Sequence, residues 1–243
     1  MTTNPHWNDL CQEYLQLCKT SSLRQAPRFQ QPALRAMIRT ISDGDVEWLR
    51  SSLGDEERKW FVAFVFNRID LPTQLFEAML RAAVREPNPS SNRAFVEPCV
   101  RAFGHRKVNR RLLDALRQGS AEEKAGAVNA MYWAQVPLVF TGAPPSWDLD
   151  HATPESREKY MAVADLVEEK RYLFLEEFVA NPDVALRRCL LAGLDLSPEH
   201  YPQQLRPLVQ QAIELARSHP DEYIRHRVEV QLGNERLLKP LPR

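Results

Sequence analysis

The sequence predicts an all-α fold in which helices stack as an array. A short acidic or proline-containing turn, then a basic residue, then an apolar helix recur about five times. The basic residues lie 35, 31, 63 and 38 residues apart, and 63 is close to two steps with an insertion; they are Arg58, Arg93, Lys124, Arg187 and Arg225. A period of this size is typical of solenoids. Only eight glycines occur, and few stretches alternate apolar with polar residues, so we expect no extensive β-sheet.

The first 44 residues are expected to cap the N-terminal end of the array. Asn4 and Pro5 fit the N-cap and first position of a helix. Its apolar stripe has helical spacing and comprises Trp7, Leu10, Cys11, Tyr14, Leu15 and Cys18. A second helix opens at Pro32 and contains Leu34, Met37, Ile38 and Ile41. Because no neighbour covers a terminal repeat, its outer face must differ, and residues 1–44 fit that role.

Residues 45–233 are predicted to form about five helical pairs. The pairs are 45–53 with 56–67, 73–85 with 91–103, 108–117 with 121–134, 153–179 with 183–194, and 203–218 with 221–232. Many of the 18 prolines fall at helix starts, where the missing N–H costs little. Because a solenoid grows repeat by repeat, we expect residues 1–243 to form a single domain.

Local signals predict several helix boundaries. Ser120 and Glu123 fit a capping box, and Thr153, which precedes a proline, fits an N-cap. Pro98 indicates a kink inside its helix. Residues 60–66, WFVAFVF, could also form a buried strand, but their flanks contain no tight-turn pair. The sequence therefore favours a continuing helix there.

Composition and charge narrow the function classes. Lysine plus arginine equals aspartate plus glutamate at 32 each, so the chain lacks the positive excess common in duplex DNA binders. The four cysteines form no close CxxC pair and are expected to be small buried hydrophobes: Cys11, Cys18, Cys99 and Cys189. The start lacks the features of a signal peptide, and the longest apolar run, 60–66, is too short to span a bilayer. We expect a cytoplasmic location and no membrane partner.

The repeated pairs resemble HEAT-repeat proteins, especially the short bacterial HEAT-like arrays. NPDVALRRCLLAGL and HPDEYIRHRVEVQL show the resemblance best, and it covers about residues 45–233. It implies a right-handed α-solenoid of antiparallel pairs, armadillo-like, whose second helices line a concave binding face. In that family a turn acid and a helix arginine often form a ladder between repeats. The acidic position is matched by Asp55, Asp183 and Asp221 but not by Ser90 or Ala121. The family includes adaptors, scaffolds and a few enzymes, so the resemblance implies a binding surface more than a chemistry.

Residues 101–111 form a basic segment without an acidic residue. Its cations and histidine are Arg101, His105, Arg106, Lys107, Arg110 and Arg111. A turn between two helices could present them to phosphates or to an acidic protein, and phosphate contacts would give salt-sensitive affinity. The alternative is a solvated loop and helix face.

The repeat is interrupted by a proline-rich insertion at residues 135–154. Loops of this length are uncommon in compact folds and are often functional. Trp147 within it could anchor a partner or seal the repeats beneath. Asp148, Asp150 and His151 have too few ligands for a convincing metal site, so we predict none. Acids outnumber cations nine to four across residues 148–177, which is typical of the solvated side of a long helix.

The preferred function is a non-enzymatic scaffold or adaptor that binds a protein or peptide on its concave face. The candidate contacts from second helices are Trp60, Arg68, Arg101, Asn129, Trp133 and Arg188. His219, Asp221 and His226 have no assignable nucleophile, and the sequence contains no phosphate-binding glycine loop, zinc spacing or nucleophile elbow. The sequence thus gives no reason to assign a catalytic residue or a cofactor.

Two alternatives remain. DNA alkylation-repair glycosylases also use a HEAT-like scaffold, and this chain has Trp133, Trp147, Asp148 and the basic segment 101–111, but these do not match the glycosylase motif in order. That alternative would make nucleic acid the partner of residues 101–111. The HEAT-like lyases and chaperones of phycobilisome pigments are the second alternative, and nothing in the sequence distinguishes a pigment pocket from core aromatics.

Overall fold

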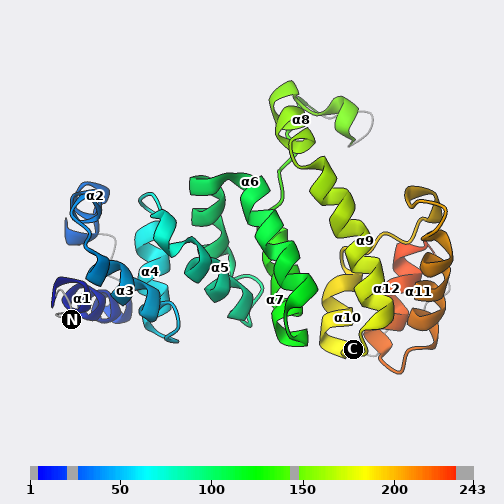
Figure 1. Cartoon of the computed structure of the whole chain (residues 1–243), viewed down its shortest axis with the longest axis horizontal. Helices are drawn as coiled ribbons and strands as arrows, with labels where there is room; N and C mark the ends of the chain where they lie inside the picture. The colour runs from blue at the N-terminus through cyan, green and yellow to red at the C-terminus, as the bar shows by residue number, and fades with distance from the viewer. Residues whose placement is uncertain (1–4, 21–26, 143–147, 234–243) are drawn as a thin grey trace. The chain divides into compact units, whose positions relative to one another are not determined.

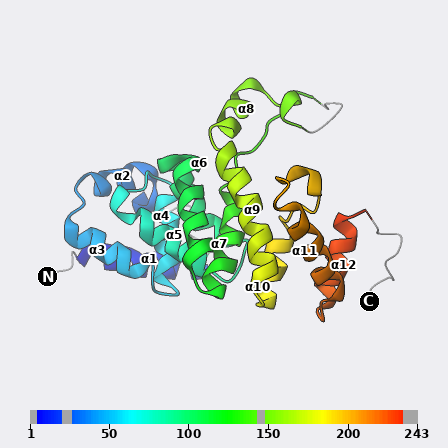
Figure 2. The ribbon, with the colours of Figure 1, turned by 45° about the vertical axis from the view of Figure 1, so that its right-hand side comes forward.

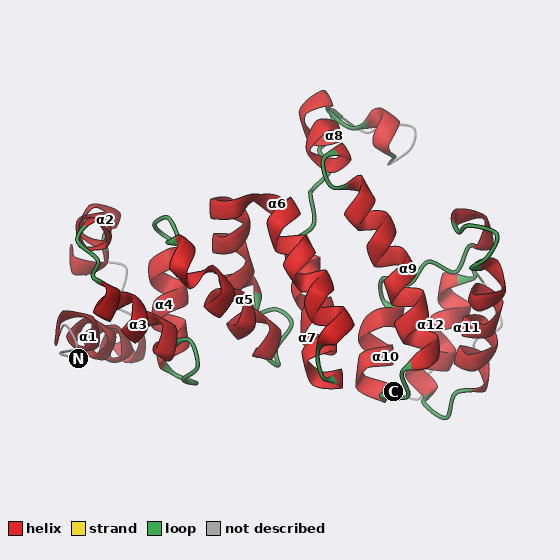
Figure 3. Ribbon diagram, in the orientation of Figure 1, coloured by secondary structure: helices red, strands yellow, loops and turns green. Residues whose placement is uncertain are grey.

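Every regular element of the described structure is a helix. The computed structural model describes residues 5–20, 27–142 and 148–233. Within these ranges there are twelve α-helices, four short 3₁₀ helices and no strand (Figures 1 and 3). An isolated β-bridge joins Phe140 and Ala152. The predicted all-α fold is confirmed.

The chain divides into two compact units. The first comprises the described residues of Met1–Val108 together with Tyr132–Ala134, and the second comprises those of Asn109–Met131 and Gln135–Arg243. The helix α6 (Arg93–Gln118) contributes residues to both units. Each unit has buried apolar side chains of its own.

The first unit is held together by an aromatic core. Its elements are α1 (Pro5–Thr20), a 3₁₀ turn at Pro27–Phe29, α2 (Gln31–Arg39), α3 (Asp43–Ser52), α4 (Arg58–Phe66), a 3₁₀ turn at Thr73–Leu75, α5 (Phe76–Arg85) and the first part of α6. The ring of Phe61 on α4 lies 6.3 Å from Trp7, 5.6 Å from Tyr14 and 6.2 Å from Trp48, centroid to centroid. Such tilted and edge-on pairs stabilise a core beyond their buried area. The WFVAFVF segment is therefore helical, as predicted.

The helix α6 is interrupted at Gly104. This residue has φ 79° and ψ 159°, and helical structure continues on either side. Only glycine adopts such dihedrals without strain. The sequence predicts two helices, 91–103 and 108–117, and the interruption falls between them. Pro98 lies inside the first of these segments and is buried.

In the second unit, two helical pairs pack side by side. Its elements are the remainder of α6, α7 (Ala121–Trp133), a 3₁₀ turn at Leu149–His151, α8 (Pro154–Met161), α9 (Ala164–Ala180), α10 (Val184–Leu191), a 3₁₀ turn at Pro198–His200, α11 (Arg206–Ser218) and α12 (Glu222–Gln231). The first helices of the two pairs, α9 and α11, contact each other, and so do the second helices, α10 and α12. α8 lies at the N-terminal end of α9, away from α10–α12 (Figures 1 and 2).

These two pairs repeat the same turn. Asp183 and Asp221 N-cap α10 and α12 by accepting from the backbone N–H three residues on, at 2.7 and 3.1 Å. The arginine four residues after each aspartate donates to backbone carbonyls. Arg187 reaches those of Phe178 and Val179 in the last turn of α9, and Arg225 reaches those of His219 and Pro220, just beyond the end of α11. Because Arg187 is used in this way, its neighbour Arg188 makes the contact between pairs, with Nε 3.2 Å from Oδ1 of Asp221. This contact joins α10 to the turn before α12, and it comes from the residue after the basic position matched in the sequence.

One prediction about residues 153–179 is wrong: the chain forms α8 and α9, separated at Ala162–Val163, rather than one helix. Thr153 occupies the N-cap position of α8 and is followed by proline, as predicted. Its hydroxyl donates to Oγ of Ser156 at 3.0 Å and makes no capping hydrogen bond to the backbone. The capping box predicted elsewhere forms: Ser120 and Glu123 each accept from the other's backbone N–H, at 3.3 and 3.2 Å.

The cysteines differ in exposure. Cys11 and Cys99 are buried, and burial raises the pKa of their thiols to about 11 and about 12 because it disfavours the thiolate. Cys18 is exposed and Cys189 is half-buried. The prediction of buried hydrophobes thus holds for Cys11 and Cys99 and is wrong for Cys18.

Candidate functional site

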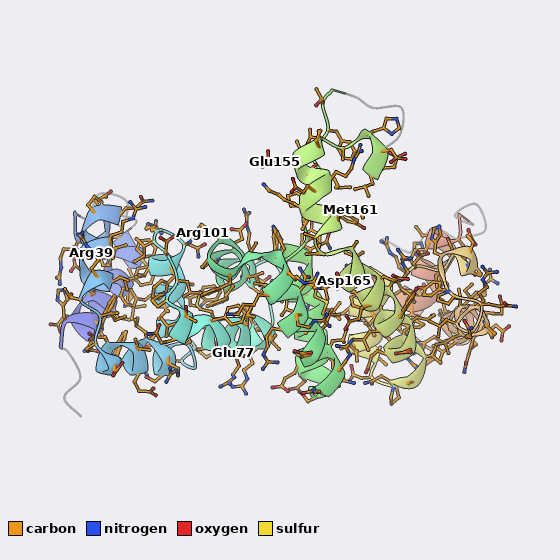
Figure 4. All side chains as sticks on the ribbon, turned by 45° about the horizontal axis from the view of Figure 1, so that its top comes forward. Arg39, Glu77, Arg101, Glu155, Met161 and Asp165 are labelled. Atoms are coloured by element: carbon orange, nitrogen blue, oxygen red, sulfur yellow. The ribbon has the colours of Figure 1, made fainter. Side chains whose placement is uncertain are left out.

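The first part of the basic segment is engaged within the first unit. Arg101, on the N-terminal part of α6 (Figure 4), donates to the carbonyl groups of Phe66 and Ile69, the second at 3.2 Å. It thus satisfies carbonyls at and beyond the end of α4. Nδ1 of His105 lies 3.0 Å from the carbonyl oxygen of Ala134.

Lys107 is also engaged. Its ammonium lies 4.5 Å from the ring centroid of Phe76 and 4.7 Å from that of Phe103. A cation held over two aromatic faces gains cation–π stabilisation. Phe103 is half-buried and meets the ring of Phe76 edge-on at 4.9 Å, and Lys107 covers both rings.

The second part of the segment is engaged within the second unit. Arg110 makes two contacts with the carboxylate of Glu169, at 2.9 and 2.8 Å, and Arg117 donates to the same carboxylate. Burial raises the pKa of Glu169, but hydrogen bonds and charge from the two arginines outweigh this and hold it below its usual range. Arg106 and Arg111 interact with other groups of the protein as well. The side chains of this basic segment therefore contact other groups of the protein. Its residues up to Val108 belong to the first unit and those from Asn109 onward belong to the second.

Trp60 and Arg68 contribute to packing in the first unit. Trp60 is half-buried, with its ring centroid 5.1 Å from that of Phe95. The guanidinium of Arg68 lies 3.5 Å from the ring centroid of Phe64 and donates to the Phe64 carbonyl at 3.1 Å. Both side chains therefore pack against aromatic rings of the first unit.

An aromatic surface lies at the C-terminal end of α7. Tyr132 is 65% exposed, and its ring meets that of Trp133 edge-on at 4.9 Å. The indole N–H of Trp133 donates to the carbonyl of Pro89 at 2.8 Å, and the guanidinium of Arg93 lies 5.1 Å from its ring. All four residues belong to the first unit. We call the surface formed by these four residues the aromatic surface: Pro89, Arg93, Tyr132 and Trp133.

Asn129 and Arg188 belong to the second unit. Asn129 hydrogen-bonds Cys189; burial raises the pKa of that thiol, and the hydrogen bond acts in the opposite direction. Arg188 binds Asp221 and lies 5.8 Å from the ring of Tyr223, which is exposed. Trp147, the remaining predicted contact, lies outside the described residues.

The DLDH sequence forms a capped turn. Oδ1 of Asp148 accepts from the backbone N–H groups of Asp150 and His151 at 3.1 and 3.2 Å and lies 2.6 Å from Nδ1 of His151. Asp148 therefore acts as an N-cap. In the part of the chain that the structure describes, no group of three or more histidine, cysteine or acidic side chains could hold a metal ion.

His219, one member of the grouping considered above, is buried and has a structural role. Its Nδ1 accepts from the backbone N–H of Asp221 at 3.0 Å, and Arg225 donates to its carbonyl. Burial, followed by the charge of Arg187, lowers its pKa. A histidine so placed supports the turn before α12.

A pocket of about 200 Å³ opens in the second unit, where α8 meets α9. Its apolar walls are Val136, Val163, Leu166 and Val167, and its polar lining comprises Asn109, Gln135, Tyr160 and Lys170. The sequence gives one signal for this site, because Lys170 has apolar residues three and four positions away on both sides. Tyr132 on the aromatic surface gives less signal in the sequence, because it directly follows the buried Ala130 and Met131.

Comparisons with protein-family models, curated proteins and solved structures find no match for this chain. The HEAT-repeat resemblance therefore remains a proposal. Across residues 5–20, 27–142 and 148–233, no helix combines the length and apolar character needed to cross a membrane.

Proposed function

We propose that the chain is a HEAT-like α-solenoid and a non-enzymatic scaffold that binds a protein or peptide. The architectural part is supported by α9–α12, where first helix packs on first helix and second on second. The shared turn, with an aspartate N-cap and an arginine four residues later, supports it further. A stack of such pairs buries its apolar surface between neighbours and leaves helix faces available for a partner.

The observation on which the binding proposal rests is the exposed Tyr132 beside a fixed Trp133. A tyrosine that leaves 65% of its surface in water buries little apolar area in the free protein. The hydrogen bond to Pro89 and the guanidinium of Arg93 hold the tryptophan in one orientation. Tyrosine, tryptophan and arginine are the residues most enriched among binding hot spots. A surface ordered before binding also loses less conformational entropy when the partner arrives.

A protein partner fits this surface better than nucleic acid does. The cation of the aromatic surface, Arg93, is already paired with Glu97 at 2.7 Å. Arg101, Lys107 and Arg110, which would have to meet phosphates, contact carbonyls, aromatic rings and Glu169 instead. Phosphate binding would have to break those contacts. We therefore propose an apolar or aromatic side chain of a protein as the group that covers Tyr132.

Recovery of the tagged full-length protein from its native lysate, with and without nuclease, tests the proposal. We expect a stoichiometric protein partner that survives nuclease and is lost by Tyr132→Ala. Met161→Ala is the matched control, because Met161 on α8 is also an exposed apolar residue, at 56% (Figure 4). Partners that disappear after nuclease would refute the protein-binding proposal. Retention of every partner by Tyr132→Ala would refute the aromatic surface.

A further inference from the structure

A pocket of the second unit contains a cation, Lys170, that has no counter-ion among the described residues. Its volume is about 200 Å³, and its lining comes from α6, the segment after α7, α8 and α9. Lys170 on α9 lines it and makes no hydrogen bond or ion pair with any other described residue. Its charged group instead lies 5.8 Å from the ring of Phe174.

The surrounding charges explain why Lys170 is left unpaired. Glu168 accepts from the hydroxyl of Tyr172, and Glu169 is bound by two arginines. Arg171, the neighbouring cation, reaches Asp195 at 3.7 Å. Each acidic residue adjacent to Lys170 in the sequence is therefore engaged elsewhere.

The position of Lys170 on α9 places it among apolar side chains. Leu166 and Val167 precede it by one turn, and Leu173 and Phe174 follow it by one turn. Burial, with a smaller contribution from the charge of Arg171, lowers the pKa of Lys170. Lys170 is half-buried. A cation partly removed from water without a partner is unfavourable, and a ligand that supplies a negative charge relieves that cost.

The remaining lining indicates the shape and chemistry of the ligand. Gln135 and Tyr160 line the pocket, and their side chains make no hydrogen bond within the described part of the chain. Four aliphatic side chains form the rest of the wall together with Asn109. Pockets for drug-sized ligands measure about 300–1,000 Å³, so this one suits a smaller molecule.

We propose that this pocket binds a small carboxylate with a short apolar tail. The carboxylate pairs with the ammonium of Lys170 and accepts from the Gln135 amide or the Tyr160 hydroxyl, while the tail contacts Val136, Val163 and Leu166. A charge-assisted contact of this kind is stronger than a neutral hydrogen bond. The tail gains affinity by removing apolar surface from water.

Hexanoate is the probe for a test by NMR titration of the ¹⁵N-labelled full-length protein, and 1-hexanol is its neutral counterpart. We expect hexanoate to shift the amide signals of residues 163–170, with a Kd at least tenfold lower than that of hexanol. Lys170→Met keeps most of the side-chain stem and removes the charge. It should raise the hexanoate Kd at least tenfold and leave the hexanol Kd within a factor of two.

Lys159→Met is the matched control, because Lys159 is an exposed lysine of α8 paired with Glu155; it should bind hexanoate as the wild type does. A second variant, Val167→Phe, places a larger side chain in the pocket and should weaken both ligands. Thermal unfolding of each variant shows that it is folded. Absence of hexanoate-dependent shifts at millimolar concentration, or an unchanged hexanoate Kd in Lys170→Met, would overturn the proposal.

Discussion

The pair formed by Lys59 and Glu86 gives the sharpest prediction about stability. Nζ of Lys59 lies 3.0 Å from Oε2 of Glu86, and the two side chains are 8% and 6% exposed. Glu86 also accepts from the backbone N–H of Asn88 at 3.1 Å. Lys59→Met would leave the Glu86 carboxylate buried without its counter-ion, which costs about 3–5 kcal/mol.

Two further variants separate this effect from the loss of a lysine in general. Lys59 also contacts Glu56 at 2.6 Å, but the Glu56 side chain is 89% exposed. Glu56→Gln should therefore cost no more than about 1 kcal/mol, the usual limit for a surface pair. The double variant Lys59→Met/Glu86→Gln removes both buried charges and should lie within about 1 kcal/mol of the wild type.

Urea unfolding followed by far-UV circular dichroism measures these free energies. Burial lowers the pKa of Lys59, but hydrogen bonds to Glu56 and Glu86 outweigh it and raise the pKa overall. The contribution of the Lys59 charge to the free energy of unfolding is therefore fully present below the pKa of a lysine in the unfolded chain, about 10.4. It is lost as the pH rises through the higher pKa of Lys59 in the folded protein. If Lys59→Met and Glu56→Gln lower the free energy of unfolding equally at neutral pH, the buried pair with Glu86 does not stabilise the fold as argued.

Two other predictions concern the backbone and the acid range. Gly104→Ala should lower the free energy of unfolding by about 1–3 kcal/mol, because φ 79° and ψ 159° are strained for alanine. Gly54→Ala is the control, because Gly54 has no such positive φ. Equal losses of stability in the two variants on urea unfolding would contradict the prediction. The lowered pKa of His219 means that its contribution to stability is present above the unfolded value of about 6.5 and is lost as pH falls. The imidazole should titrate below pH 6.5 by NMR, and a midpoint above 6.5 would contradict the role assigned to it beside the Asp221 N–H.

Local chemistry made much of the fold predictable. The helical α4 and the Ser120–Glu123 capping box depend on residues within a few positions of one another. The separation of α8 from α9 was missed because apolar spacing continues across Ala162–Val163.

The candidate sites were less predictable because their contacts are distant in the sequence. Arg101 reaches a carbonyl 32 residues earlier, and Arg110 reaches Glu169, 59 residues later. Neither contact can be inferred from the composition of residues 101–111. A run of cations there therefore resembles a surface that is available to bind phosphates. Lys170 was grouped with the solvated acids and cations of residues 148–177, although its apolar neighbours at three and four positions indicated an inward face.

The central claim is that a protein partner binds through Tyr132 of the aromatic surface. The affinity of the recovered partner for Tyr132→Ala tests it most directly. Isothermal titration of wild type, Tyr132→Ala and Met161→Ala gives the three Kd values under one condition. A hot-spot tyrosine costs at least about 2 kcal/mol on truncation, which corresponds to roughly a 30-fold rise in Kd. We expect that rise for Tyr132→Ala and a Kd within twofold of the wild type for Met161→Ala. Equal Kd values for all three proteins would contradict binding through the aromatic surface.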